Sequence, residues 1–367
     1  MIGVLLLAAI SYRNPVIFAD YSDPDVIRAG SDYYLVASSF QCVPALPILH
    51  SLDVVHWTLV NYAADRLPSP DFDGPQHGNG MWAPSIRYHG GFFWIFVGDP
   101  DRGIFMTRSR DPRGRWDPLV LIKDAKGWID PCPFWDDDGS LYLVHAWAKS
   151  RVGFNSVLSM NRLSADGRKV IDSGTVVFDG HEHHPTIEGP KLYKRNGWYY
   201  IFAPAGGVKN GWQTVLRAKN IFGPYEDKIV LEDGNHQGAW VEAVDGSSWF
   251  VHFKDRGAYG RLVHLQPMSW VNDWPVIRVA TTLLSVPAQT GVSVPHKAGL
   301  EWQWLGNPKR DWLSLRNGTM RLTAVPVSGS LWSATNLLLQ KFPAAAFTAT
   351  TRVDVRGLRA GERAGLV

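Results

Sequence analysis

Three acidic residues stand at matching points of the sequence, just ahead of prolines. Asp23 and Asp130 each come directly before a proline, and Glu188 comes two residues before one. Several carboxylates in one pocket are electrostatically costly, because like charges raise one another's pKa. Glycoside hydrolysis uses such a group: one protonated carboxyl gives its proton to the leaving oxygen, and one ionised carboxylate acts from the opposite face of the sugar. A third carboxylate can keep the pKa of the acid near the working pH.

The other motifs fit different chemistries less well. The run His181-Glu182-His183-His184 has the residue types of a metal site, but it leads into a strand instead of lying on a helix at zinc-enzyme spacing, so we expect loop histidines. The acidic run 136–138 precedes a glycine in an expected hairpin turn, where aspartate bonds its own backbone. Phosphate-binding loops, paired CxxC motifs and a nucleophile elbow are missing from the sequence, which argues against nucleotide and serine-hydrolase chemistry.

Composition narrows the class of protein further. The net charge is only +3, and the Lys and Arg residues are scattered, so the sequence shows no basic patch that would bind the phosphates of a nucleic acid. The 17 Trp, 12 Tyr, 16 Phe and 35 Gly favour strands joined by tight turns, and aromatic faces also suit sugar ligands. Cys42 and Cys132 lack metal-ligand spacing, so we expect free thiols. No organic cofactor is expected.

The N-terminal residues 1–10 are apolar, but they are too few to span a bilayer, so no membrane partner is expected. They also lack the basic start of a signal peptide. A truncated signal, a gene-start artefact and a first strand all remain open, and we expect a secreted or periplasmic protein over a cytoplasmic one.

A repeat supplies the elements that would position the acids. Five segments each pair a short motif with an aromatic strand that follows a Gly or Asp-Gly turn. The motifs are 22–27, 82–86, 130–134, 188–192 and 236–241, and the strands are 33–36, 92–96, 141–144, 198–202 and 249–253. Residues Tyr34, Phe93, Tyr142, Tyr199 and Phe250 lie 59, 49, 57 and 51 residues apart, which is a propeller-blade period. A third strand is predicted to recur at 51–57, 109–116 and 218–225.

The predicted fold is therefore all-β: a five-bladed β-propeller over residues 12–285, followed by an incomplete, jelly-roll-like β-sandwich over residues 286–367. In the second region, 320–325 and 347–355 are expected strands. A β-sandwich with coincidental spacing is the alternative for the first region. In a propeller, the first strand of each blade lines the central channel, so Asp23, Asp130 and Glu188 should converge from three blades.

With these motifs in this order, the sequence resembles glycoside hydrolase family 43, in particular its β-xylosidase and α-L-arabinofuranosidase members with a C-terminal β-sandwich. The resemblance covers about residues 13–280. It depends on five ordered motifs: 18–28 (FADYSDPDVIR), 82–85 (WAPS), 128–131 (WIDP), 186–190 (TIEGP) and 236–238 (HQG). The stretch from 231 to 237, which borders the pocket, is short for those members.

The resemblance implies a role for each acid. Asp23 activates the water, Glu188 protonates the departing oxygen, and Asp130 tunes the pKa of the acid and orients it, with inversion at the anomeric carbon. An inverting pair is expected to lie about 6.5–9.5 Å apart.

The resemblance also implies the surrounding residues. Arg261 is the sugar-contacting arginine, with Arg256 as the competing choice. Trp82 and Phe40 wall the sugar site, with core packing as the alternative reading. His236 lies near the channel axis, where a structural calcium or other cation is held through water.

The expected function is an exo-acting glycosidase that releases terminal xylose, arabinofuranose or both from plant hemicellulose oligosaccharides. Three alternatives stay open. Two are an endo-acting arabinan hydrolase of the same fold and a non-catalytic carbohydrate-binding propeller, which would have no need for Asp23 and Glu188. The third is a retaining, fructan-cleaving enzyme, suggested by Arg110-Asp111-Pro112. The repeat argues against the third, because Asp111 aligns with Asp53 and Asn220 in an expected outer strand, away from the channel.

Overall fold

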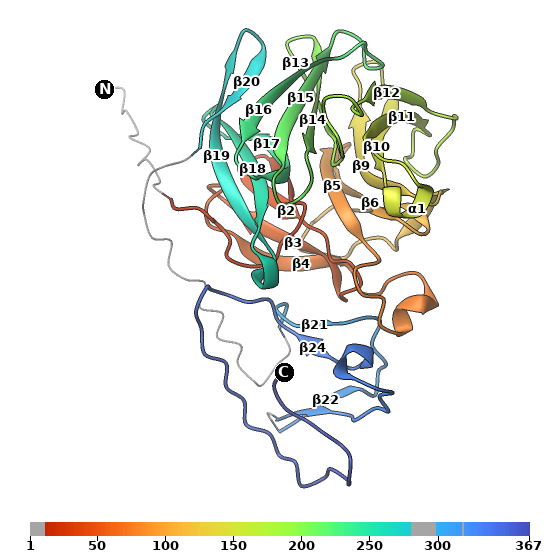
Figure 1. The fold of residues 1–367 in the computed structure, drawn as a ribbon, viewed down its shortest axis with the longest axis vertical. Helices are drawn as coiled ribbons and strands as arrows, with labels where there is room; N and C mark the ends of the chain where they lie inside the picture. The colour runs from red at the N-terminus through yellow and green to blue at the C-terminus, as the bar shows by residue number, and fades with distance from the viewer. Residues whose placement is uncertain (1–11, 280–298, 318) are drawn as a thin grey trace.

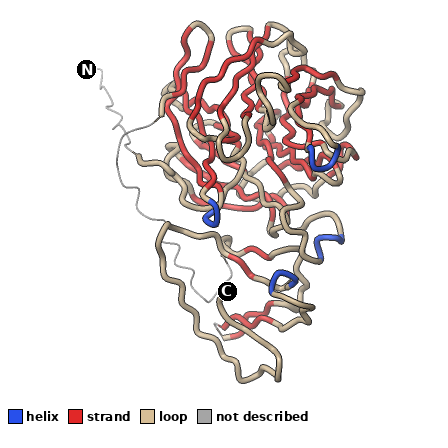
Figure 2. Tube along the Cα trace, in the orientation of Figure 1, coloured by secondary structure: helices blue, strands red, loops and turns tan. Residues whose placement is uncertain are grey.

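The computed structural model describes residues 12–279, 299–317 and 319–367. Its first part is a ring of five blades, each a four-stranded antiparallel sheet (Figures 1 and 2). The strands are β1 (Asp25–Ala29), β2 (Asp32–Val36), β3 (Ala45–Ser51) and β4 (Thr58–Ala64) in blade 1; β5 (Trp82–His89), β6 (Phe92–Asp99), β7 (Gly103–Ser109) and β8 (Val120–Asp124) in blade 2; β9 (Trp128–Trp135), β10 (Leu141–Trp147), β11 (Val157–Leu163) and β12 (Thr175–Asp179) in blade 3; β13 (Lys191–Arg195), β14 (Trp198–Ala205), β15 (Trp212–Ala218) and β16 (Glu226–Glu232) in blade 4; and β17 (His236–Glu242), β18 (Ser248–Asp255), β19 (Arg261–Val271) and β20 (Trp274–Ile277) in blade 5. The five-bladed propeller prediction is confirmed.

The aromatic second strands form the buried layers between blades. Tyr34 of blade 1 meets Phe93 of blade 2 edge to face, with ring centroids 5.1 Å apart. Phe202 and Phe250 stack between blades 4 and 5, with ring centroids 6.1 Å apart. Because each sheet buries both faces against its neighbours, the period of large aromatics in the sequence is the period of the blades.

The predicted third strands were misplaced. Residues 51–57, 109–116 and 218–225 each begin at the last residue of the third strand and then form the turn toward the fourth strand. The Asp or Asn that recurs in them caps this turn: the side chains of Asp53, Asp111 and Asn220 accept hydrogen bonds from the backbone N–H two residues later. The repeated signal was turn chemistry of the Asx type.

The residues before β1 close the ring by pairing with β19 of the last blade. Ile17 bridges Val263, and Asn14 exchanges side-chain hydrogen bonds with both backbone groups of Leu265. The N-terminal run 1–10 lies outside the described residues. In residues 12–279, 299–317 and 319–367, no helix is long and apolar enough to cross a membrane.

The C-terminal region contains two small sheets beside the propeller (Figure 1). They are formed by β21 (Gln303–Trp304) with β24 (Leu338–Leu339) and by β22 (Leu313–Arg316) with β23 (Thr319–Leu322). The expected strand at 320–325 is confirmed only up to Leu322, and 347–355 is not a strand. A strand needs a hydrogen-bonding neighbour, and the described region offers none to 347–355. The domain boundary predicted at 285/286 lies outside the described residues.

Four short helices complete the described elements. They are η1 (Pro70–Asp73), α1 (Lys149–Val152), η2 (Gly257–Tyr259) and η3 (Leu331–Ser333). η1 lies in the connection between blades 1 and 2, and α1 lies between the second and third strands of blade 3. Both belong to the face on which the innermost strands begin.

Candidate active site

At or just before the start of each innermost strand, one residue has a left-handed backbone conformation. The positive φ angles are 55° at Asp23, 41° at Ala83, 57° at Asp130, 58° at Gly189 and 26° at Gln237. Non-glycine residues are uncommon in this region, although aspartate tolerates it better than most. Strained backbone of this kind clusters at functional sites. The five equivalent positions define one ring of residues at the mouth of the channel.

Glu188 lies one step outside this ring, because Gly189 takes the left-handed position of its blade. A Cβ on Gly189 would come within 2.7 Å of the Gln237 side chain, so glycine allows blades 4 and 5 to approach closely here. The offset gives Glu188 a different position from Asp23 and Asp130, and its side chain is about one quarter exposed.

The Asp23 carboxylate is buried and held by two donors. The Ser38 hydroxyl donates to Oδ2 at 2.6 Å, and Nη1 of Arg261 lies 3.1 and 3.2 Å from the two carboxylate oxygens. Ser38 in turn accepts a hydrogen bond from the backbone N–H of Ala83 at 2.7 Å. Such charge-assisted bonds fix the orientation of the carboxylate. The sequence offered no signal for Ser38, which follows a strand with no motif around it.

Arg261 begins β19 and is the arginine that reaches the acids. Its backbone N–H donates to Asp20 at 2.9 Å, and its guanidinium lies 5.0 Å from the ring centre of Phe253 and 5.9 Å from that of Phe40. Arg256, the competing choice, is an exposed residue just before η2. The geometry therefore favours Arg261 for contact with a ligand beside Asp23.

Asp130 is buried and lies close enough to both other acids to feel their charges. Burial first, and then the neighbouring Glu188 and Asp23, raise the pKa of Asp130 well above its ordinary range. Two groups oppose this rise in pKa: the backbone N–H of Gly189, which donates to Oδ2 at 2.8 Å, and the charge of Lys191. The same interactions show that the three acids from three blades meet, as the sequence predicted.

Lys191 was not identified from the sequence. It is fully buried in the first position of β13, and its Nζ donates to the carbonyl of Pro84 at 3.1 Å and to the Ser85 hydroxyl at 2.8 Å. A buried lysine usually has an electrostatic partner. The available signal was a lysine inside an innermost strand, where blades 2, 3 and 5 have the small residues Ser85, Cys132 and Ala239 and blade 1 has Asp25.

The raised pKa of Asp130 predicts an effect on stability. A carboxyl whose pKa is higher in the folded state destabilises the fold as pH rises from its unfolded pKa, about 4, through its folded pKa. We expect Asp130→Asn to raise the unfolding temperature at pH 7–8 by roughly 2–4 °C, with a smaller gain near pH 4. Thermal unfolding across pH measures this.

The matched control for that measurement is Asp136→Asn. Burial tends to raise the pKa of Asp136, but hydrogen bonds from Lys194 and Tyr199 outweigh burial, so the pKa is lower than usual. This variant should therefore lower the unfolding temperature at neutral pH. If Asp130→Asn is destabilising at neutral pH as well, the carboxylate cluster does not carry the electrostatic cost inferred here.

His236 begins β17 and is buried beside Glu188. Its Nε2 lies 3.1 Å from Oε1 of Glu188, without the geometry of a hydrogen bond. Among the described residues, neither ring nitrogen of His236 nor either side-chain polar atom of the buried Asn235 has a hydrogen-bond partner. Buried polar groups normally have one, so this pocket suits water or a water-bound ion.

Trp82 and Phe40, the two aromatics expected to wall the sugar site, are both half-buried. Trp82 begins β5 and pairs with Gly98, and a Cβ on Gly98 would come within 3.4 Å of the backbone nitrogen of Asp130. The backbone of Phe40 bridges Met81, and its side chain is half-buried. Trp82 also packs against a core cluster of blades 3 and 4, whereas the Phe40 ring lies 5.9 Å from the Arg261 guanidinium.

The remaining candidates lie away from the acids. His181 and His183 are exposed and contact only nearby acids in the described chain, whereas His184 is buried and its Nε2 lies 2.8 Å from Asp227. No group of three or more His, Cys, Asp or Glu that could hold a metal ion occurs among the described residues. Asp111 caps its turn, and both cysteines are free thiols.

A five-bladed propeller that brings three carboxylates and an arginine to the start of its innermost strands defines a glycoside hydrolase. Comparison with known proteins agrees: residues 12–275 match the model of glycosyl hydrolases family 43, and residues 295–367 match the β-xylosidase C-terminal concanavalin A-like domain. The chain belongs to glycosyl hydrolase family 43.

The relatives and solved structures span most of this chain. A provisionally named β-xylosidase from Xylanibacter ruminicola is 42% identical over 95% of this chain and 69% of its own length. A non-reducing-end α-L-arabinofuranosidase from Bacteroides ovatus is 27% identical over 98% of this chain and 74% of its own. The family 43 protein BlXynB of Bacillus licheniformis, solved as a mutant, has a TM-score of 0.79 at 27% identity, covering 91% of this chain and 72% of that one.

Proposed function

We propose that this glycosidase is an inverting, exo-acting enzyme that releases terminal xylose, arabinofuranose or both from hemicellulose oligosaccharides. The observation that carries the proposal is the meeting of Asp23, Asp130 and Glu188 beside Arg261. A carbohydrate-binding propeller without catalysis would not need to bury a carboxylate between two others.

The proposed reaction is a single displacement. Asp23 takes a proton from a water molecule as the water oxygen bonds to the anomeric carbon. The bond from that carbon to the leaving oxygen breaks on the opposite face, and Glu188 gives its proton to that oxygen. Asp130, which is buried close to both of these acids, orients Glu188, while Arg261 holds Asp23 and faces the sugar.

Two features support action on chain ends and on pentoses. The ring of Trp332, in the C-terminal region, stacks on His77 of the blade 1–2 connection at 3.8 Å, so this region covers part of the rim near Phe40 and Met81. A covered rim favours removal of single terminal sugars over cleavage within a chain. The names of the relatives from X. ruminicola and B. ovatus favour xylose and arabinofuranose as those sugars.

Two measurements on the intact chain test this proposal. Initial rates on nitrophenyl β-xyloside and nitrophenyl α-arabinofuranoside should show turnover of at least one, and proton NMR of the first-formed sugar should show the inverted anomer. Retention would contradict the role of Asp23 as a base. Faster cleavage of internal arabinan linkages than of either aryl glycoside would favour the endo-acting alternative.

A cation near the channel axis is also proposed. The unpartnered, buried polar atoms of Asn235 and His236 support it, and the described residues lack a cluster that would bind a metal directly. An ion such as calcium would therefore be held chiefly through water, which suits its preference for oxygen ligands. When bound, it would supply positive charge near Glu188.

A further inference from the structure

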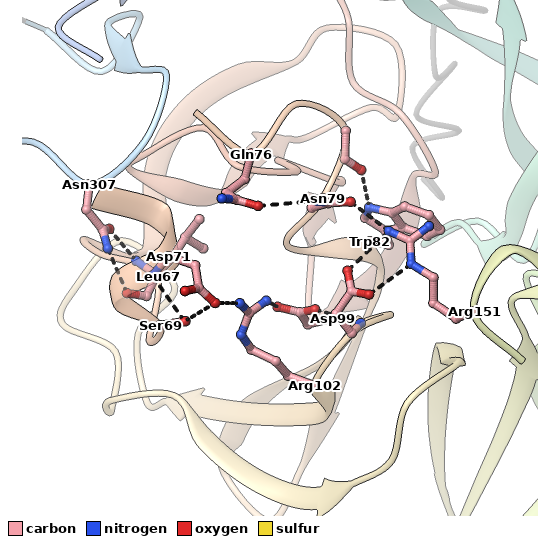
Figure 3. A network of polar contacts seen from close by, with 12 residues as sticks. Leu67, Ser69, Asp71, Gln76, Asn79, Trp82, Asp99, Arg102, Arg151 and Asn307 are labelled. Carbon is pink, nitrogen blue, oxygen red and sulfur yellow. Dashed lines mark hydrogen bonds and ion pairs between the residues drawn. The ribbon is translucent and has the colours of Figure 1, made fainter. Parts of the chain in front are cut away.

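Arg151 of α1 lies beside Trp82 and bonds two other loops (Figure 3). Its Nε and one terminal nitrogen donate to the two oxygens of Asp101 at 3.0 and 3.1 Å. The same terminal nitrogen donates to the side-chain oxygen of Asn79 at 2.6 Å. The guanidinium also lies 5.4 Å from the centre of the Trp82 ring. One side chain from blade 3 thus ties the blade 1–2 connection to a turn of blade 2.

The segment that Arg151 holds has little structure of its own. Residues 74–81, which lead into Trp82, form no helix or strand. The indole N–H of Trp82 donates to the carbonyl of Gly78 at 2.8 Å, so the ring is oriented by a loop residue. The position of the ring therefore depends on what restrains this loop, and Arg151 bonds its last polar side chain, Asn79.

We propose that Arg151 is a positioning residue for the sugar-binding site: it holds the Trp82 ring and the loop before it in the place where the ring can pack against the terminal sugar. The proposal depends on the function proposed above and on the expected place of Trp82 as a wall of the sugar site. The backbone around Trp82 reaches both acids: the Ala83 N–H donates to Ser38 beside Asp23, and Gly98, which pairs with Trp82, abuts the backbone of Asp130.

The chemistry of the guanidinium suits this task. A planar fork can bind a carboxylate through two bonds and still present its face to an aromatic ring, which a lysine cannot do at once. Asp101 neutralises the charge, so Arg151 can stay mostly buried, at 19% side-chain exposure, without an unpaired cation in the site.

The primary test compares Arg151→Met with the wild type on the aryl glycoside that the enzyme turns over. Loss of the clamp should raise KM about five-fold, the scale of a partly desolvated cation–aromatic contact, and leave kcat within about two-fold. Arg151→Lys should show an intermediate KM, because it restores the charge but not the fork. An unchanged KM in Arg151→Met overturns the proposal.

Arg102→Met is the matched control. Arg102 belongs to the same network, where it pairs with Asp99 and Asp71 and lies 4.9 Å from the centre of the Phe72 ring, but it does not contact Trp82 (Figure 3). Its KM should stay near the wild-type value. An equal rise in KM would show that any weakening of this region has the same effect, and would overturn a specific role for Arg151.

A double-mutant cycle separates positioning from general stability. If Arg151 acts through Trp82, adding Arg151→Met to Trp82→Ala should raise KM no further, whereas independent effects would multiply. Multiplying effects would overturn the proposal. Failure of the proposed function is a distinct outcome, since wild-type protein would then turn over neither aryl glycoside.

Discussion

Glu188→Gln should lose about 10³-fold in kcat on xylobiose or a comparable natural oligosaccharide, because the amide cannot give a proton to the leaving oxygen. The loss on a nitrophenyl glycoside should be far smaller, since nitrophenol leaves without much help from an acid. KM should change little, because the amide keeps the size of the carboxyl. Steady-state kinetics on the two leaving groups measure this difference.

Glu182→Gln is the control for that experiment. Glu182 lies six residues earlier in the same connection, with its side chain 86% exposed and paired only with His183 in the described chain. Its kinetics should match the wild type on both substrates. Undiminished turnover of the natural substrate by Glu188→Gln would remove Glu188 from the acid role.

Asp23→Asn should also lose about 10³-fold in kcat, but equally on natural and nitrophenyl substrates. The base acts on the attacking water, whose activation is needed whatever the leaving group is. The amide can still accept from Ser38 and sit beside Arg261, so substrate binding should persist. Kinetics on both substrates, with binding followed by calorimetry, give the result.

The contrast between the two variants is as informative as either loss. The exposed Asp65, which follows β4, provides the control Asp65→Asn, expected to behave as wild type. A leaving-group dependence in Asp23→Asn like that of Glu188→Gln would mean that the roles of acid and base are assigned the wrong way round.

The site combines strain and electrostatic cost in one ring of residues. Asp23 and Asp130 adopt left-handed backbone, and Asp130 is buried near two other acids. Neither feature stabilises a propeller, and the glycine of blade 4 shows that the same position can be filled without a side chain. The expected gain in stability of Asp130→Asn follows from this, because selection for activity retains groups that the fold alone would not.

Much of the architecture could be predicted from local patterns. Each blade is a series of hairpins between neighbouring strands. Short stretches of sequence, in which aromatic strands alternate with Gly turns such as Gly90-Gly91, are therefore enough to predict a blade. The third strands were misplaced because Asx turns at Asp53, Asp111 and Asn220 recur as regularly as strands do. The strand expected at 347–355 failed because β propensity forms no strand without a neighbour to pair with.

The sequence by itself determined the fold class, the register of the five motifs and the three acids that share it. Only the tertiary structure decided which arginine reaches them, because Arg256 and Arg261 lie five residues apart on either side of η2 and only Arg261 contacts Asp23. It also revealed Ser38, Lys191 and Arg151. Each has a partner from another blade, and such contacts exist only once the ring has closed and set the distances between strands far apart in the chain.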